Sequence, residues 1–400
     1  MKRRDVLAGF ACVGAGAVLF SRQVHSEQSA CASTGALGII VERATGSLLI
    51  VDTIARTRIA RVEGLGDLSH ASAVFSRDAR YVFVFGRDGG LSKVDLLSRT
   101  LAGRVVQAGN AIGGAISDDG RLVAVSNYEP GGVNVFDADT LAPLVEIAAD
   151  VGGGKRSKTV GLVDAPGRRF VYTLYDAGEI WIADFAGWSG GPPAVTRFPG
   201  VGKQPYDGSI TGDGRHYIAG LFGEDGLVQL DLWSDPIAPR RILDGYGRGE
   251  APLPVYKMPH LEGWAEVAGA ILLPAVGRHE LLAIDAQTFG ERGRVATHGQ
   301  PIFAVAQPGS PNVWVNFAHP LNDTVQIVDV RTLKVVHTFK PGPAVLHLEF
   351  TPRGNEVWIS VRDADRIDIH ETRHFEKIGS LPAQKPSGIF FTSRAHRIGQ

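Results

Sequence analysis

The pattern of hydrophobic and polar positions repeats along the chain. Each unit starts with a short apolar strand, turns through polar residues rich in Asp and Gly, and continues into a stronger hydrophobic strand, as in "AVFSRDARYVFVFG", "GAISDDGRLVAVSN" and "GSITGDGRHYIAGL". A third strand with an Asp turn follows, as in "GVNVFDADTLAPL", and a fourth short strand closes the unit. Such a unit is typical of the four-stranded antiparallel blade of a β-propeller.

The units can be counted along the chain. Six begin at His70, Ile112, Thr159, Pro205, Pro301 and Val345, and a seventh, with a degenerate turn, begins at His260. Residues 36–62 resemble the last three strands of a blade, and the C-terminal "SGIFFTSRAHRIG" resembles a first strand. Joining these ends would complete an eighth blade and remove the free sheet edges of an open array.

We therefore predict an all-β fold, a single eight-bladed β-propeller domain over residues 36–400 that is closed by N- and C-terminal strands. A count of seven blades stays open if one unit is miscounted. Residues 232–258 are expected to form a surface excursion near the mouth of the propeller.

Composition agrees with this fold and narrows the function. The 400 residues include 50 glycines, 22 prolines and 2 methionines, which favours many tight turns and few long helices. Because 41 Lys and Arg nearly balance 42 Asp and Glu, the formal charge is -1, and no global positive field recruits nucleic acid. A charged ligand must then be held by a local cluster.

Residues 1–32 are predicted to be a cleaved export signal. Arg3 and Arg4 precede an apolar run at residues 6–20, which resembles a twin-arginine signal and is too short to cross a bilayer comfortably. Ala30 and Ala32 offer an A-x-A cleavage site. The mature chain is therefore expected in the periplasm without a transmembrane segment, with an ordinary secretory signal as the alternative.

The two cysteines, Cys12 and Cys31, both lie in this leader. A mature chain cut after residue 32 would have no thiol, which excludes disulfides and cysteine nucleophiles. Cys31 is also a candidate for a lipid anchor, although Gln28 stands where a lipobox has Leu.

Several polar residues stand just ahead of the first strand of a unit, a position that brings distant segments together near the axis of a propeller. They are His70, Tyr206 with Asp207, His260, and the basic cluster Lys155, Arg156 and Lys158. His70 introduces the second blade and His260 the sixth, so the two imidazoles are expected to face each other. Imidazole is a good axial ligand for haem iron, and Lys and Arg pair with carboxylates. The plainer alternatives are a surface histidine and a solvated basic turn.

The chain resembles a known family in this region. "SHASAVFSRDARYVFVFGRDGGLSKVDL" is similar to the segment that carries the proximal haem ligand in the d1 propeller of cytochrome cd1 nitrite reductases, with His70 at the ligand position. "PYDGS" resembles a distal-pocket segment in which Tyr206 replaces a histidine, and "KMPHLEG" resembles a second one, with His260 at the histidine. The resemblance covers the chain from about residue 36 to its end.

Two departures from the reductases refine this resemblance. The chain has no C-x-x-C-H motif and so no cytochrome c domain, unlike the reductases and the related dehydrogenase NirN. In addition, Ala73 and Gly263 stand where the reductases have arginines that contact ligand carboxylates. The overall pattern is most similar to the stand-alone d1-type propellers of haem d1 biosynthesis.

This resemblance implies a periplasmic protein that binds haem d1 or its dihydro precursor non-covalently, with His70 as the axial iron ligand. It also implies transient contacts with nitrite reductase and NirN during cofactor maturation. Lys155, Arg156 and Arg87 become the candidates for the ligand carboxylates, with Lys158 beside them. The second axial ligand, and whether the chain forms a homodimer, stay open.

The sequence leaves the choice between carrier and enzyme open. If the protein is catalytic, Asp207 and Glu262 are candidate general acids or bases, and Tyr206 is a candidate proton donor or distal ligand. One alternative is a lactonase-like propeller hydrolase with Ca²⁺ held by Glu129, Asp207 and Glu262. Another is a non-enzymatic interaction propeller.

Overall fold

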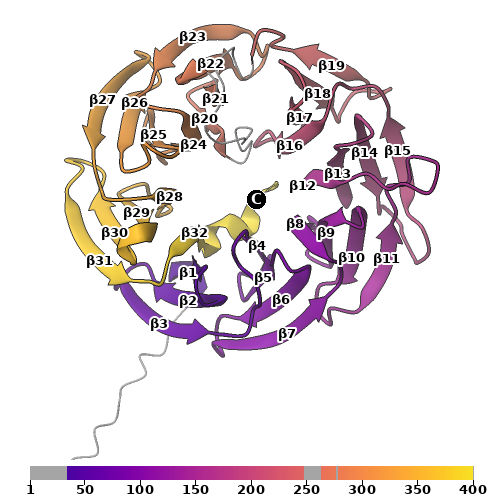
Figure 1. Ribbon diagram of the computed structural model, residues 1–400, viewed down its shortest axis with the longest axis horizontal. Coiled ribbons are helices and arrows are strands. Elements are labelled where there is room, and N and C mark those ends of the chain that lie inside the picture. The colour runs from indigo at the N-terminus through magenta and orange to yellow at the C-terminus, as the bar shows by residue number, and fades with distance from the viewer. Residues whose placement is uncertain (1–33, 247–262, 276–277, 400) are drawn as a thin grey trace, which may run out of the picture. The chain divides into compact units, whose positions relative to one another are not determined.

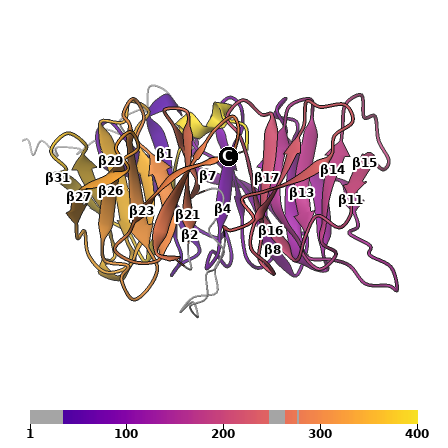
Figure 2. The ribbon, with the colours of Figure 1, turned by 90° about the horizontal axis from the view of Figure 1, so that it is seen from above.

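The computed structural model describes residues 34–246, 263–275 and 278–399. In this part of the chain the strands form eight four-stranded antiparallel sheets, which are arranged around a central axis (Figure 1). The predicted eight-bladed propeller is confirmed, and the alternative with seven blades is wrong. Figure 2 shows the same ring from its edge, with the strands of each blade running side by side.

The blades follow one another along the chain. The closing blade contains β1 (Leu37–Glu42), β2 (Ser47–Asp52), β3 (Thr57–Val62) and β32 (Pro386–Phe391). The second contains β4 (Ser72–Phe75), β5 (Tyr81–Phe85), β6 (Gly90–Asp95) and β7 (Thr100–Val106). The third contains β8 (Asn110–Ile116), β9 (Leu122–Glu129), β10 (Gly132–Asp137) and β11 (Pro143–Ile147). The fourth contains β12 (Thr159–Ala165), β13 (Arg169–Leu174), β14 (Glu179–Asp184) and β15 (Ala194–Phe198).

The remaining four blades repeat this order. The fifth contains β16 (Pro205–Ile210), β17 (His216–Leu221), β18 (Leu227–Asp231) and β19 (Pro239–Ile242). The sixth contains β20 (Ala265–Val267), β21 (Ala270–Ala275), β22 (Glu280–Asp285) and β23 (Glu291–Ala296). The seventh contains β24 (Pro301–Ala306), β25 (Asn312–Phe317), β26 (Val325–Asp329) and β27 (Lys334–Phe339). The eighth contains β28 (Val345–Phe350), β29 (Glu356–Val361), β30 (Arg366–Glu371) and β31 (Lys377–Pro382).

Helical structure with described bounds is limited to short 3-10 turns, namely η1 (Thr34–Ala36), η4 (Arg362–Ala364) and η5 (Thr392–His396). No helix in the described ranges is long and apolar enough to span a membrane. The predicted excursion at residues 232–258 is corrected in part, because residues 239–242 form β19, the outermost strand of the fifth blade. Its later part, from residue 247, lies outside the described residues.

The turns of the repeats are built from side-chain hydrogen bonds. Between β4 and β5, the Ser76 hydroxyl donates to Asp78 and accepts from the backbone N–H of Tyr81. Between β6 and β7, the Asp95 carboxylate accepts the backbone N–H groups of Leu97 and Ser98. These local bonds stabilise tight turns at fixed places in the sequence, which explains why the repeat can be read from the chain.

The ring closes through pairing of its two terminal strands. β32 pairs antiparallel with β1, and the Thr392 hydroxyl donates to the backbone oxygen of Leu37 at 2.9 Å. Buried side chains from the eighth and closing blades, among them Ile40, Trp358 and Ile389, pack across this seam. The seam is therefore held by strand pairing and by a buried apolar cluster.

The innermost strands carry irregularities close to their starts. Register shifts fall between Val160 and Val163 in β12 and between Pro205 and Gly208 in β16. Similar shifts occur in β24 after Pro301 and in β28 after Val345. A bulge leaves a residue unpaired and re-aims its side chain. In this fold the bulges bring polar and aromatic side chains to the axis.

Candidate functional site

A cavity of about 230 Å³ lies among the starts of the innermost strands. Its walls come from the strand starts of seven blades, from the β1–β2 hairpin, and from the C-terminal segment, which comprises residues 392–399 after the last strand. The lining includes Arg43, Ser69, His70, Ser72, Ile112, Tyr206, Asp207, Phe303, His347, Ser387, Phe390 and Arg394. Of the predicted site residues, His70, Tyr206 and Asp207 are therefore together in one cavity.

His70 is half-buried and directly precedes β4. The backbone at this point is shaped by Asp67, whose carboxylate accepts the N–H of Ser69 at 2.8 Å. Two hydroxyl oxygens that line the same cavity, Ser72 Oγ and Ser387 Oγ, are buried and have no hydrogen-bond partner in the described part of the chain. Buried hydroxyls normally have partners, so these two are available to bond water or a bound ligand.

Tyr206 belongs to an aromatic cluster at the edge of the cavity. Its hydroxyl shares a 2.6 Å hydrogen bond with the hydroxyl of Tyr128, and its ring lies 6.0 Å from that of Tyr175 and 5.8 Å from that of Phe222. Burial raises the pKa of Tyr206, and the charge of Asp207 adds to this effect. The phenol therefore stays protonated near neutral pH and can donate a hydrogen bond.

His347 lies deeper, in the bulge of β28. Its Nδ1 accepts the backbone N–H of Ile389 at 3.2 Å, so in the neutral ring the proton is on Nε2. Burial and the charge of Arg394 together lower the pKa of His347 to about 4, against the opposing charge of Glu349. His347 is thus a neutral hydrogen-bond donor at physiological pH.

The cations that line the cavity differ from those predicted. Arg43 and Arg394 are lining residues, whereas Arg87, Lys155, Arg156 and Lys158 are not. Burial lowers the pKa of Arg43, with further contributions from the charges of Arg362 and Arg87, so positive charges crowd this region.

The predicted basic cluster lies outside the cavity and is exposed. Arg156 forms ion pairs with Glu146 and Asp150, and Lys158 Nζ lies 3.3 Å from a carboxylate oxygen of Asp176. Lys158 Nζ is also 5.2 Å from the centre of the Tyr175 ring, which joins it to the aromatic cluster.

Arg87 is exposed, but it lies close enough for its charge to oppose the rise of the Tyr206 pKa. His260 and Glu262 lie outside the described residues, so the predicted facing of His70 and His260 stays a prediction. Glu129 is exposed at the end of β9, and the described residues contain no group of three or more His, Cys, Asp or Glu side chains that could hold a metal ion.

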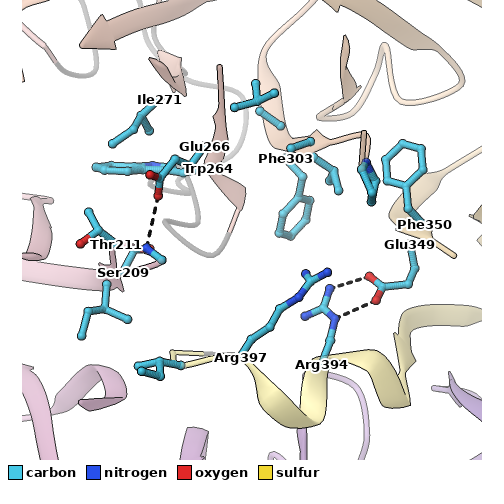
Figure 3. A pocket seen from close by; sticks show the side chains of 18 of the residues that line it. Ser209, Thr211, Trp264, Glu266, Ile271, Phe303, Glu349, Phe350, Arg394 and Arg397 are labelled. Atoms are coloured by element: carbon cyan, nitrogen blue, oxygen red, sulfur yellow. Dashed lines mark hydrogen bonds and ion pairs between the residues drawn. The ribbon is translucent and has the colours of Figure 1, made fainter. Parts of the chain in front are cut away.

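A second cavity, of about 660 Å³, lies at the other ends of the innermost strands. Phe303, His347 and Arg394 line both cavities and form the waist between them. Figure 3 shows the second cavity, with Trp264 and Glu266 on one wall and Arg394 and Arg397 on the opposite wall. The axial space thus has two chambers, one at His70 and one at Arg397.

Sequence reasoning missed Arg43, His347 and Arg394. A signal for His347 was present, because aligning the first strands "PYDGSI" and "VLHLEF" of two repeats puts His347 at the position of Asp207. Arg43 sits in a hairpin and Arg394 in the segment after the last strand, where no repeat pattern applies.

An axial cavity with an imidazole at its edge and arginines in its wall is a candidate ligand site in a β-propeller. The model of the family described as "Cytochrome D1 heme domain" matches residues 32–395, and the chain belongs to that family.

Within the family, two relatives of high sequence identity share a name. The chain is 56% identical over 376 residues to Protein NirF of Pseudomonas aeruginosa, covering 94% of this chain and 95% of the relative. It is 55% identical over 368 residues to Protein NirF of Stutzerimonas stutzeri, covering 92% and 94%. The chain therefore belongs with the NirF proteins.

A solved structure of a d1-domain relative supports the fold and the family. The structure described as "Dihydro-heme d1 dehydrogenase NirN in complex with DHE" matches with a TM-score of 0.79 and 28% identity, over 91% of this chain and 77% of that one. The d1-type propeller inferred from the sequence is thereby confirmed.

Proposed function

We propose that the protein binds haem d1 or its dihydro precursor non-covalently in the His70 chamber and acts in a late step of haem d1 biosynthesis. The observation that carries this proposal is the position of His70 at the axial cavity of a propeller of the cytochrome D1 heme domain family. The NirN relative of known structure is described as a complex with DHE, which supports a ligand of this class.

The residues present suit such a group. His70 would supply an axial nitrogen to the iron, and Arg43 would pair with a peripheral carboxylate. The hydroxyls of Ser72 and Ser387, which have no partner among the described residues, would donate to polar substituents. The chamber is smaller than the roughly 300–1,000 Å³ of common ligand pockets, so the macrocycle would also extend outward past Arg87 and the tyrosine cluster.

Proton transfer in this chamber would fall to Tyr206 and Asp207. The Tyr206 phenol is protonated, hydrogen-bonded to Tyr128 and adjacent in sequence to Asp207, an arrangement suited to giving a proton to a bound ligand. When bound, the haem iron would supply redox or Lewis-acid chemistry. Glu262 stays a candidate acid or base, and the proposal covers both a carrier and an enzyme acting on tetrapyrrole side chains.

The test is an absorption titration of the mature protein with haem d1 or dihydro-haem d1. We expect a shift of the iron bands for the wild type that is lost or altered in His70→Ala. The matched control is His374→Ala, because the side chain of His374 is 68% exposed and does not line either cavity. An unchanged spectrum in all three proteins would refute the haem proposal and leave the hydrolase and interaction-propeller hypotheses standing.

A second comparison separates catalysis from carriage. Asp207→Asn and Tyr206→Phe keep the size of each side chain and remove its acid–base function. If both variants bind the ligand like the wild type but fail to support cofactor maturation in a deletion strain, the protein is an enzyme. Full maturation by both variants would contradict the catalytic part of the proposal.

We also propose that residues 1–32 direct export to the periplasm by the twin-arginine route, with Cys31 as a lipid attachment site if cleavage occurs before it. The protein would meet nitrite reductase and NirN there, as a monomer or a homodimer. Replacing Arg3 and Arg4 by lysine should retain the protein in the cytoplasm. Normal periplasmic recovery of that variant would contradict the twin-arginine route.

A further inference from the structure

The second chamber, at Arg397, takes no part in the proposed function, yet it is the larger of the two. Its volume is about 660 Å³, against about 230 Å³ at His70, and it falls within the range of small-molecule pockets. It is formed by the far ends of β16, β24 and β28, by residues 264–269, and by the C-terminal segment. A cavity of this size raises the question of what its charged groups can bind.

The C-terminal segment holds Arg397 in a defined position. The backbone oxygen of Arg397 accepts a hydrogen bond from the guanidinium of Arg77 at 3.1 Å. The backbone N–H of Arg397 donates to the backbone oxygen of Arg394 at 3.0 Å. Two residues later, the N–H of Gly399 donates to Asp164 at 2.8 Å. Arg77 itself pairs with the buried Asp164 at 2.8 Å, so the segment is tied to the second and fourth blades.

Arg394 and Arg397 both line this chamber, but only Arg394 has a carboxylate partner among the described residues. Arg394 donates through Nε and Nη2 to the two oxygens of Glu349, at 2.8 and 2.6 Å, which neutralises it. The Arg397 guanidinium forms no ion pair or hydrogen bond with any described residue, although it lies beside Arg394 (Figure 3). The Arg397 side chain is exposed to the solvent of the chamber. Partial desolvation and the charge of Arg394 lower the pKa of Arg397, and the charge of Glu349 opposes them. A guanidinium beside a second cation gains by binding an anion.

The other walls select the kind of anion. Glu266 lies across the chamber and accepts the N–H of Gly212 at 3.2 Å, so that side repels negative charge. Trp264 Nε1 is buried without a partner in the described part of the chain, and Trp264, Phe303 and Phe350 give one part of an otherwise mainly polar lining an apolar surface. An organic anion with a flat apolar body can use this surface together with the charged groups, which a small, strongly hydrated ion such as phosphate cannot do.

We propose that the Arg397 chamber is a second binding site, for a small aromatic or otherwise apolar carboxylate whose carboxylate group pairs with Arg397. Its apolar body lies against Phe303, Phe350 and Trp264. The site is separate from the His70 chamber, because the waist formed by Phe303, His347 and Arg394 stands between them. The proposal does not depend on haem binding.

The test measures benzoate binding to the mature protein by isothermal titration calorimetry, with benzamide as an uncharged analogue of the same shape. We expect saturable binding of benzoate, binding of benzamide at least tenfold weaker, and a loss of about tenfold or more in Arg397→Gln, because a charge-assisted bidentate hydrogen bond is removed. Arg397→Lys keeps the positive charge but lacks the planar guanidinium that binds both carboxylate oxygens. Its affinity for benzoate should therefore lie between those of the wild type and Arg397→Gln.

The matched control is Arg58→Gln, because Arg58 is an exposed arginine on β3 that lines neither chamber. The Arg58 variant should bind benzoate like the wild type. Equal benzoate affinity in the Arg397 and Arg58 variants, or no binding by the wild type at millimolar benzoate, would overturn the proposal. A thermal melt of each variant shows whether the fold is intact, and the lysine variant serves if the glutamine variant is unstable.

A final arm distinguishes a free carboxylate from a carboxylate side chain of the tetrapyrrole that reaches through the waist. Benzoate is titrated into protein preloaded with dihydro-haem d1. Unchanged affinity supports a separate site, whereas loss of benzoate binding overturns it. If the tetrapyrrole itself fails to bind, the benzoate result still stands, so failure of the haem proposal and failure of this one give different results.

Discussion

Protonation of His347 should destabilise the fold under mildly acidic conditions. The neutral ring accepts the N–H of Ile389 on Nδ1, so an added proton would set two N–H groups against each other. Burial and the nearby charge of Arg394 lower the pKa of His347 to about 4, and the charge of Glu349 only partly compensates. The charged form of this side chain is therefore strongly disfavoured in the folded protein.

The size of the effect follows from the difference between the folded and unfolded pKa. In the unfolded chain a histidine has a pKa of about 6.5, so below that pH the unfolded state binds more protons and stability falls until the pH reaches the folded pKa. At pH 5 these two values give a loss of about 2 kcal/mol in the free energy of unfolding relative to neutral pH. Because both chambers can admit water next to the ring, we expect about 1–2 kcal/mol.

The assay is urea unfolding, followed by tryptophan fluorescence at neutral pH and at about pH 5. His347→Asn keeps an acceptor for the Ile389 N–H and cannot titrate, so its stability should fall less on acidification than that of the wild type, by about 1–2 kcal/mol. His374→Asn, which removes an exposed imidazole, should behave like the wild type. The reasoning is refuted if the His347 variant loses as much stability as the wild type.

Three further predictions concern contacts described above. Arg77→Met should destabilise the protein by about 3–5 kcal/mol, because it leaves the buried carboxylate of Asp164 without its cation, and adding Asp164→Asn should recover part of this in urea unfolding. Tyr128→Phe removes the hydroxyl partner of Tyr206 and should cost about 1 kcal/mol by the same measurement, whereas an unchanged midpoint would argue against that hydrogen bond. Gly208→Ala places a methyl group against the buried hydroxyl of Tyr217, so it should lower the melting temperature and alter ligand binding, and a melting temperature like that of the wild type would contradict the crowding.

The fold could be predicted because each repeat carries its own local signals. The Ser76 and Asp95 turns occur at fixed distances from hydrophobic strands, and similar sequences recur in the other blades. The closure of the ring could be predicted from the number of strands at each end, since the chain starts with the last three strands of a blade and ends with the first strand of that blade. Local pattern and global arrangement agree in this chain, which is a property of natural sequences.

The candidate site could be predicted only where it uses the repeat. His70, Tyr206 and Asp207 stand at equivalent strand starts, and the structure brings them together. Arg43 and Arg394 stand outside the repeat, so their place in the wall depends on how the hairpin and the C-terminal segment pack. The predicted basic cluster does not line the cavity. The sequence shows that these residues are charged but not which carboxylates they pair with, and Arg156 is already neutralised by Glu146 and Asp150.

The pairing of β32 with β1 has a consequence for how the molecule folds. The two strands are separated by almost the whole length of the described chain, so their contact has a very high sequence separation. Seven blades can form from neighbouring strands, whereas the closing blade must wait until residues 386–391 have been synthesised and have met residues 37–42. Because that blade also supplies Ser387, Phe390 and the start of the Arg394 segment, both chambers are completed in the last step of folding. A ligand that binds either chamber should therefore stabilise the closed ring and slow the separation of β32 from β1.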